Sequence, residues 1–448
     1  MLTRRAFLAT SAAVLGAHAL GGPRLRAASP GPRVNPSRLR SELQGLSVFG
    51  RPPGGTFADG VSRVGFSDAD VEGRRYVMSL MRAAGLQPRI DPAGNIFARR
   101  PGGDASLAPI LFGSHIDSVP NGGNFDGDLG SLAALEAIRI LDEQKIATRR
   151  PLEIVVWANE EGVAYGNGLC GSRAVAGLLE AGELQHVWNG VIKSDAIRKI
   201  GGDPDRIDTA HREAGSIHGY FELHIEQGGT LERGGISVGV VEGIVAIDRY
   251  EATVRGFANH AGTTPMPERK DALVAASHLA IAVREIVVRE PGRQVGTVGQ
   301  LVVTPNAPNV IPGSVRLTIE LRDLSIEKIS RLAEEIERRA AQIAQGTGTT
   351  IEIARTSRHH GALAAPSMQE IVARAADDLG LSHVRMPSGA GHDAQSMAKL
   401  APMGMVFVPS VGGISHSPKE LTTWEDCARG ADVLLRAVLL ADAAPSLS

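Results

Sequence analysis

Apolar runs of strand length alternate with helical patterns in the first half of this chain. Residues 109–113 and 152–157 are short apolar runs, and apolar residues recur at helical spacing over 132–141 between them. Helical patterns also cover 38–49 and 69–84, and a further strand is expected at 219–224. A strand, a helix and a strand at this spacing form a βαβ unit, which predicts a mostly parallel sheet with both faces covered.

The pattern changes near residue 246. Strands are expected at 246–254, 294–303, 314–321 and 349–354, and helices at 269–289 and 326–345. This βαββαβ order is the ferredoxin-like arrangement, a self-contained α+β unit. From residue 366 the earlier alternation resumes, with a helix at 368–379 and a strand at 403–408.

These patterns predict an α/β protein of two domains, because 448 residues are too many for one compact core. A doubly wound catalytic domain with a mostly parallel sheet is expected over 36–245 and 358–448. A ferredoxin-like lid or dimerisation domain is expected to interrupt it at 246–357. Residues 1–35 are set apart as a leader and linker.

Composition narrows the classes of function and of metal site. The net charge of -2 gives no reason to expect nucleic acid or an anionic membrane as a partner. Cys170 and Cys427 are the two cysteines, so neither a disulfide framework nor a thiolate-rich zinc site is expected. A metal site built mainly from histidine and carboxylate ligands is therefore favoured.

The N-terminus resembles a twin-arginine export signal. Arg4 and Arg5 precede Phe7 and Leu8, and the apolar stretch 6–20 is too short to span a bilayer. The segment 29–36 is a Pro-rich linker. These features predict a periplasmic or otherwise exported protein without a membrane anchor. The alternative is a frayed, Arg-rich tail.

Candidate chemistry begins directly after the first predicted strands. His115 follows a strand, where ligands bind in open α/β sheets, and Asp117 is a candidate partner to orient its imidazole. Asp126 could bridge two metal ions, or Asp126 or Asp128 could merely cap the next helix.

Adjacent acids favour the metal interpretation. Glu160 and Glu161 follow a buried strand, where two carboxylates are costly unless a cation meets them. One can bind a metal ion while the other takes a proton from water, although a solvated loop would also hold neighbouring acids. His224 and His416 each follow a further strand. All of these segments lie past strands of one predicted sheet, so one shared site is expected.

The wording of these segments resembles the M20 family of di-metal amidohydrolases and peptidases over about residues 40–440. It is most similar to the branch of N-carbamoyl-L-amino-acid hydrolases, allantoate amidohydrolases and β-ureidopropionases. The motifs that carry the resemblance are Asn-Phe-Asp-Gly-Asp at 124–128, His-Ile-Glu-Gln-Gly at 224–228, Asn-His-Ala-Gly-Thr-Thr-Pro-Met at 259–266 and Gly-Ala-Gly-His-Asp at 389–393.

The resemblance implies two divalent ions per subunit (zinc, manganese, cobalt or nickel) and assigns a role to each matching residue. Glu160 matches the general base, and Asp126 matches the bridging carboxylate. The other implied metal ligands are His115, His224, Glu161 and His416.

The resemblance also implies residues that bind the substrate. His260, Asn309 and Arg322 match residues that bind the substrate carboxylate and polarise its carbonyl, and Gln227, Arg249 and Gly391 match the pocket wall less closely. A histidine matching His260 reaches the neighbouring subunit in related enzymes, so a homodimer is expected. From the residues alone, Arg322 could instead pair with Asp323, and Asn309 could be a turn residue.

One departure concerns the strand at 246. Relatives often have Gly-Gln-Arg where this chain has Ala246-Ile247-Asp248, so a polar contact with the substrate is in doubt. His359-His360 is expected at a hinge or on the surface, and His392-Asp393 is expected to shape the pocket.

Together these features predict a metal-dependent hydrolase of linear amide or amidine C–N bonds. It would remove the carbamoyl or ureido group of a small carboxylate-bearing substrate, such as an N-carbamoyl-L-amino acid or allantoate, and release ammonia and carbon dioxide. An M20-type peptidase or N-deacylase is the nearest alternative, and an exported solute-binding protein is the alternative from another class.

Overall fold

The computed structural model describes residues 31–447. The predicted export signal falls on residues 1–30, outside the described residues, and it stays a prediction together with the expected location of the protein. Within residues 31–447, no helix is both long enough and apolar enough to cross a bilayer.

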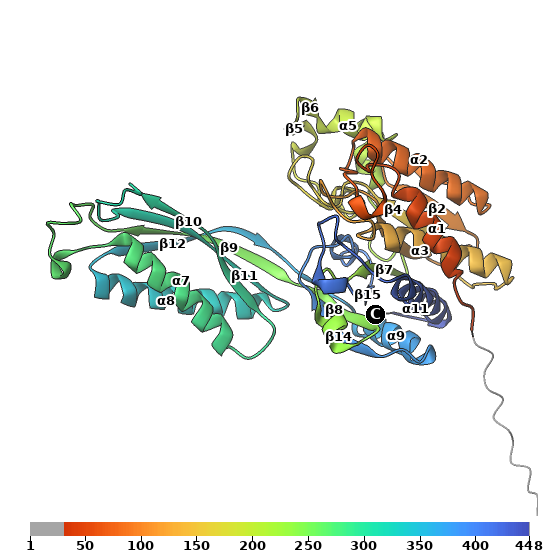
Figure 1. Cartoon of the computed structure of the whole chain (residues 1–448). Coiled ribbons are helices and arrows are strands. Elements are labelled where there is room, and N and C mark those ends of the chain that lie inside the picture. The colour runs from red at the N-terminus through yellow and green to blue at the C-terminus, as the bar shows by residue number, and fades with distance from the viewer. Residues whose placement is uncertain (1–30, 448) are drawn as a thin grey trace, which may run out of the picture. The chain divides into compact units, whose positions relative to one another are not determined.

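The strands predicted for the catalytic domain belong to one nine-stranded sheet (Figure 1). Its central strands are parallel: β3 pairs with β4 and β7, and β7 pairs with β15. This parallel centre confirms the prediction of a mostly parallel sheet. Antiparallel strands flank it on both sides. The strand order is β1 (Arg89–Ile90), β2 (Ile96–Arg100), β4 (Leu152–Trp157), β3 (Ile110–His115), β7 (Gly219–Ile225), β15 (Met403–Val408), β8 (Val238–Ile244) and β13 (Ala362–Leu363), and β14 (His383–Ser388) also pairs with β8.

Apolar cores cover both faces of this sheet, which explains why its central strands are unbroken apolar runs. In β3, Phe112 joins the larger core and its neighbour Leu111 joins the second core. The helices of the larger core are α1 (Pro36–Leu46), α2 (Asp68–Ala83), α3 (Asp128–Glu143), α9 (Pro366–Asp378) and α11 (Trp424–Ala443). The short helices α4 (Cys170–Val175) and α10 (Ala394–Met397) contribute to the second.

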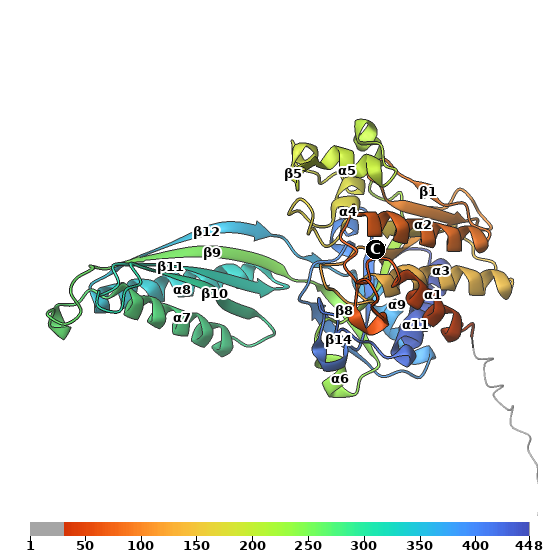
Figure 2. The ribbon, with the colours of Figure 1, turned by 45° about the horizontal axis from the view of Figure 1, so that its top comes forward.

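The inserted segment forms a separate antiparallel sheet of four strands. Its two helices, α7 (Ala272–Arg289) and α8 (Ile326–Thr347), lie side by side on one face of the sheet (Figure 2). The strand order β10-β11-β9-β12 confirms the ferredoxin-like prediction. Its elements in chain order are β9 (Ala246–Arg255), α7 (Ala272–Arg289), β10 (Val295–Thr304), β11 (Ser314–Asp323), α8 (Ile326–Thr347) and β12 (Thr350–His359). The predicted domain boundaries at 246 and 357 stay a prediction, and β12 runs two residues past the second one.

A charged pair lies under the helical face of this sheet. Asp248 of β9 is buried and lies opposite Arg358 of β12 in the strand register. The Arg358 Nε donates to Asp248 Oδ1 at 2.8 Å, and the Tyr250 hydroxyl donates to Asp248 Oδ2 at 3.0 Å. The Arg358 guanidinium also donates to Ser330 Oγ of α8 at 3.1 Å. The pair therefore links the two strands to the helix above them.

Replacing Asp248 by alanine should destabilise the protein by about 1–3 kcal/mol, because the Arg358 donors and the Tyr250 hydroxyl lose their shared acceptor. Urea unfolding followed by circular dichroism measures the change. Glu352→Ala is the matched control, since this acid of β12 makes only an exposed pair with Arg255 at 3.9 Å. Equal losses in the two variants would contradict the assigned role of Asp248.

Candidate metal centre

The predicted ligands gather at the carboxyl ends of neighbouring parallel strands. His115 is the last residue of β3, and His224 is the penultimate residue of β7. Glu160 and Glu161 follow the end of β4 after two residues, Ala158 and Asn159. Because parallel strands end at the same edge of a sheet, side chains far apart in sequence meet there.

Two groups of side chains are close enough to hold a metal ion each. In the first, His115 Nε2 lies 3.5 Å from Asp126 Oδ1 and His224 Nε2 lies 3.0 Å from the same oxygen. In the second, His416 Nε2 lies 3.5 Å from Asp126 Oδ2 and 3.4 Å from Glu161 Oε2. Asp126 belongs to both groups, one carboxylate oxygen to each. The structure thus brings together all five ligands expected from the sequence.

Main-chain oxygens orient the two buried imidazoles. His115 Nδ1 donates to the Asp117 carbonyl at 3.0 Å, and His224 Nδ1 donates to the Ile225 carbonyl at 2.9 Å. Both bonds leave Nε2 as the nitrogen that faces Asp126. The nearest Asp117 carboxylate oxygen is 3.7 Å from His115 Nδ1, so this carboxylate is not the direct partner expected from the sequence.

The Asp117 carboxylate instead orients the pair of glutamates. Its Oδ1 accepts from the Glu160 N–H at 3.0 Å, and its Oδ2 accepts from the Glu161 N–H at 3.2 Å. Asp117 thereby ties the loop after β3 to the loop after β4. The two glutamates that follow β4 are placed by their backbone.

The helix-capping alternative for Asp126 and Asp128 is wrong. Helix α3 begins at Asp128, and its N-cap is Gly127, which supplies no side-chain bond. Asp128 forms a buried ion pair with Arg63. Gly127 has a φ of 68°, and a Cβ there would overlap the His115 imidazole, so a glycine is required beside this side chain.

The charges of this centre fit divalent metal ions. Burial raises the pKa of Glu161 to about 9, with the nearby Asp126 carboxylate adding to the rise, and burial raises the pKa of Glu160 well above its usual range. Within residues 31–447, neither Lys nor Arg forms an ion pair with these three acids, and the buried Glu161 Oε1 has no hydrogen-bond partner. Histidine nitrogens and carboxylate oxygens are ligands that zinc and its neighbours accept.

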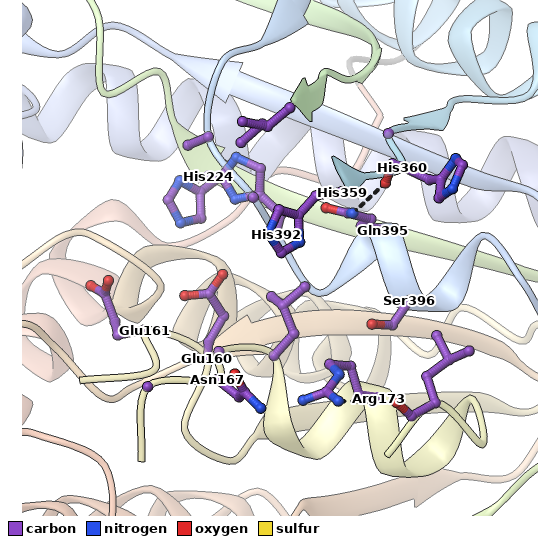
Figure 3. A pocket seen from close by; sticks show the side chains of 18 of the residues that line it. Glu160, Glu161, Asn167, Arg173, His224, His359, His360, His392, Gln395 and Ser396 are labelled. Atoms are coloured by element: carbon purple, nitrogen blue, oxygen red, sulfur yellow. Dashed lines mark hydrogen bonds between the residues drawn. The ribbon is translucent and has the colours of Figure 1, made fainter. Parts of the chain in front are cut away.

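A cavity of about 830 Å³ opens onto this centre. Figure 3 shows Glu160 and Glu161 on one side of it and His224 and His392 on the other. The His392 ring lies 4.4 Å from that of His224, and its Nε2 is 2.9 Å from the Ser388 hydroxyl. His392 therefore forms part of the cavity wall beside the first metal group.

The three residues expected on the pocket wall all line the cavity. Gln227 Nε2 donates to Asp126 Oδ2 at 2.6 Å, and Arg249 Nε donates to Glu320 at 2.7 Å. Gly391 is exposed in the loop before α10. His359 and His360, expected at a hinge or on the surface, also line the cavity, and Gln395 Nε2 donates to the His360 carbonyl at 2.7 Å (Figure 3).

Arg322 lies next to the loop that borders the cavity. Its Nη1 donates to the Gly389 carbonyl at 2.6 Å, and its Nε donates to Glu320 at 2.7 Å. The alternative pairing with Asp323 is wrong, because Asp323 pairs with Lys328 at 3.1 Å. A cationic fork with one acidic partner thus lies close to the cavity wall.

His260 and Asn309 lie elsewhere. They are neighbours, since the Ala261 N–H donates to the Asn309 carbonyl at 3.0 Å, and neither is among the described residues that line the cavity. Asn309 lies in the exposed turn that precedes β11. The strand begins at Ser314, which is eight residues before Arg322. Eight residues of antiparallel strand span roughly 27 Å. The three substrate residues expected from the sequence do not converge within one chain.

The segment Ala246-Ile247-Asp248, which differs from the Gly-Gln-Arg common in relatives, changes the cavity wall at one position. Side chains alternate along a strand, so Asp248 faces the helices while Ile247 and Arg249 face the other way. Ile247 lines the cavity, whereas Asp248 serves the buried pair with Arg358. The doubtful polar contact is therefore confined to Ile247.

Sequence reasoning missed Glu420, which is buried and contacts the backbone of Asp126. The available signal was an acid four residues after a ligand candidate, in Ser-His-Ser-Pro-Lys-Glu. An acid in a loop of this composition is usually solvated, so its burial could not be inferred from the pattern.

Comparison with known proteins extends these observations to the whole chain. The model of peptidase family M20/M25/M40 matches residues 111–440. An N-carbamoyl-L-amino acid amidohydrolase of Geobacillus stearothermophilus is 40% identical over 407 residues, which cover 90% of this chain and 98% of that protein. A ureidoglycolate hydrolase of Arabidopsis thaliana is 37% identical, with 90% of this chain and 85% of that protein covered.

Solved structures show the same likeness. The crystal structure of an amidase of the hydantoinase/carbamoylase family from Burkholderia multivorans superposes with a TM-score of 0.85 at 36% identity, and it covers 93% of this chain and 100% of its own. The resemblance inferred from the motifs is confirmed. The chain belongs to peptidase family M20/M25/M40.

Proposed function

We propose that this protein is a di-metal amidohydrolase that removes the carbamoyl or ureido group from a small substrate bearing a carboxylate. The observation that carries the proposal is the Asp126 carboxylate, which shares its two oxygens between two metal-binding groups beside Glu160. Similarity to N-carbamoyl-L-amino-acid amidohydrolases over nine-tenths of the chain supports the substrate class.

His115, Asp126 and His224 would hold one divalent ion, and Asp126, Glu161 and His416 the other. Zinc, manganese, cobalt and nickel all suit these donors. Such ions lower the pKa of water and polarise a carbonyl oxygen.

Glu160 is the best candidate for the general base. It lines the cavity and belongs to neither group of ligands. It would take a proton from the attacking water and return it to the leaving nitrogen. The water oxygen forms a C–O bond to the carbamoyl carbon, and the C–N bond to the amine then breaks. This yields the free amine and carbamic acid, which loses its remaining C–N bond to give ammonia and carbon dioxide.

Arg322 would bind the substrate carboxylate. Its guanidinium already holds one carboxylate, that of Glu320, and its fork suits a second, planar anion. The Gly389 carbonyl that it contacts lies two residues from Gly391 of the cavity wall. A small substrate anchored there would reach toward the metal centre.

A second copy of the chain would supply His260 and Asn309. The strand β11 separates these residues from Arg322 by roughly 27 Å, so one chain cannot close all three around a small substrate. His260 Nδ1 accepts from the Gly262 N–H at 3.0 Å, which leaves a proton on Nε2. That N–H suits the oxygen of a developing tetrahedral intermediate.

The four-stranded sheet offers a surface for this second copy. Strand β10 is an edge strand without a charged residue, and Val295, Leu301 and Val302 on it are exposed. Helix α7 contacts β10 and exposes apolar side chains at a spacing of seven: Val274, Ile281 and Val288. An uncovered apolar edge of this kind pairs readily with another strand. A homodimer through this surface would cover it.

The first prediction tests the reaction. Metal-reconstituted protein should release ammonia from N-carbamoyl-L-amino acids or allantoate, and chelation should abolish the release. Glu160→Gln should lower kcat by about 10²–10⁴-fold while metal content stays unchanged, because the base and not a ligand is removed. Cleavage of dipeptides or N-acyl amino acids instead of ureido compounds would favour the peptidase or deacylase alternative. Tight substrate binding without turnover or bound metal would favour a solute-binding protein.

The second prediction tests the docking residue. Arg322→Ala should raise KM by roughly 10²-fold for a carboxylate-bearing substrate, since a charge-assisted bidentate contact is lost. Steady-state kinetics measure it, with Arg316→Ala on the exposed part of the same strand as control. An unchanged KM in the Arg322 variant contradicts carboxylate docking at this residue.

The third prediction tests the shared site. Glu160→Ala and His260→Ala homodimers should each be nearly inactive. A heterodimer of the two, purified through different tags, should regain about half of the wild-type activity, because one of its two sites has both residues intact. If His260 acted within its own chain, the heterodimer would contain no intact site and would stay inactive.

A further inference from the structure

Glu420 is a buried acid that the proposed reaction does not use. Its residue is 4% exposed, and it lies four positions after His416. One carboxylate oxygen, Oε1, accepts from the N–H groups of Phe125 at 3.0 Å and of Asp126 at 3.1 Å. The other, Oε2, accepts from the Ser415 hydroxyl at 2.8 Å. A single carboxylate thus joins the segment of Asp126 to the segment of His416.

The loop that carries His416 depends on this junction. Backbone and side-chain bonds close the loop at its base, from Val411 N–H to the Leu421 carbonyl at 2.7 Å and from the Thr422 hydroxyl to the Pro409 carbonyl at 3.0 Å. At its tip, the His416 side chain is 49% exposed. These bonds at the base do not reach the residues next to His416.

The Gly412 N–H of the loop donates to Glu232 of α6 (Thr230–Gly234) at 2.7 Å. Beyond it, hydrogen bonds from residues 413–420 to described residues outside the loop come from Ser415 and Glu420. The one Ser415 hydroxyl proton lies between two acceptors, Glu420 Oε2 at 2.8 Å and Asp126 Oδ2 at 3.1 Å, and Glu420 accepts the two backbone N–H groups. His416 itself approaches Asp126 and Glu161 no closer than 3.4 Å. The position of this imidazole is therefore set by its neighbours in the loop and not by bonds of its own.

The first metal group is held differently. His115 and His224 lie within strands of the central sheet, and a carbonyl oxygen fixes each ring through Nδ1. These supports do not involve Glu420. Loss of Glu420 should therefore affect the group of Asp126, Glu161 and His416 more than the group of His115, Asp126 and His224.

We infer that Glu420 is a positioning residue that assembles the second metal site by tying the His416 loop to the backbone at Asp126. The inference rests on the proposed function for the metals themselves. The fold reserves space for this carboxyl group, because a Cβ at Gly123 would overlap it. Among residues 31–447, Asp126 is the one residue of the cavity wall that hydrogen-bonds to Glu420, so Glu420 acts through the expected ligands.

The glutamine variant separates tethering from charge. The two backbone N–H groups can only donate, so an amide at 420 would turn its oxygen toward Phe125 and Asp126. Its NH₂ group would then donate to Ser415 Oγ, whose own hydroxyl proton can still go to Asp126 Oδ2. Glu420→Gln thus preserves every link of the tether, whereas Glu420→Ala removes all of those made by the carboxylate.

The experiment measures zinc per chain after reconstitution and dialysis, and zinc affinity by calorimetric titration. Wild type and Glu420→Gln should hold about two zinc ions. Glu420→Ala should hold about one, with the affinity of the weaker site lowered roughly 10–100-fold, as for other residues that orient metal ligands. Glu425→Ala is the matched control and should behave as wild type, because this exposed acid, five residues after Glu420, pairs with Arg429 at the surface.

Two tight zinc ions in Glu420→Ala would overturn the inference, and so would equal losses in the glutamine and alanine variants. If Glu420→Ala does not fold, Ser415→Ala tests the part of the tether that reaches His416. It removes the bonds from Ser415 to Glu420 and Asp126 and leaves the Glu420 bonds to the Phe125 and Asp126 N–H groups in place. It should also lose the second zinc ion, and retention of both would refute the tether. A wild-type protein that binds no zinc, manganese, cobalt or nickel would instead refute the proposed function.

Discussion

The concentration of negative charge around Asp126 is the constraint to which the rest of the centre responds. Asp126, Glu160 and Glu161 lie at one end of the central sheet, and histidines are their nearest cationic partners within residues 31–447. Burial of such charge is costly unless a cation compensates for it. Divalent ions would supply that compensation, so metal loading and stability of this region are expected to be coupled.

The position of the metal centre could be predicted because the strands of the central sheet can be recognised from the sequence. Strands buried on both faces are unbroken apolar runs, and polar residues that follow such runs stand out. His115 ends β3 two residues after its apolar part, and Glu160 lies three residues after the end of β4. The assumption that parallel strands end at one edge then placed these side chains together, and the structure agrees with it.

Features that depend on loop geometry could not be predicted in this way. The sequence suggested that Asp117 would contact His115 through its carboxylate, but the carbonyl makes that bond and the carboxylate binds the 160–161 backbone. Glu420 was overlooked because burial in a Pro- and Ser-rich loop leaves no periodic signal. The strand β8 and the helix α11 were also missed, since Gly239 and Gly243 interrupt the first and Arg429, Gly430 and Asp432 interrupt the apolar pattern of the second.

The length of β11 has a consequence for how this protein would behave in dilute solution. A ten-residue strand is too stiff to bring its two ends together, so in the proposed homodimer Arg322 and His260 of one chain would serve different reaction centres. Catalysis would then be lost on dilution while the metals remain bound, because separated chains keep their metal ligands and lose the His260 Nε2–H of the second copy. Specific activity would rise with protein concentration until association is complete. The length of this strand would thereby make turnover depend on the association of two chains.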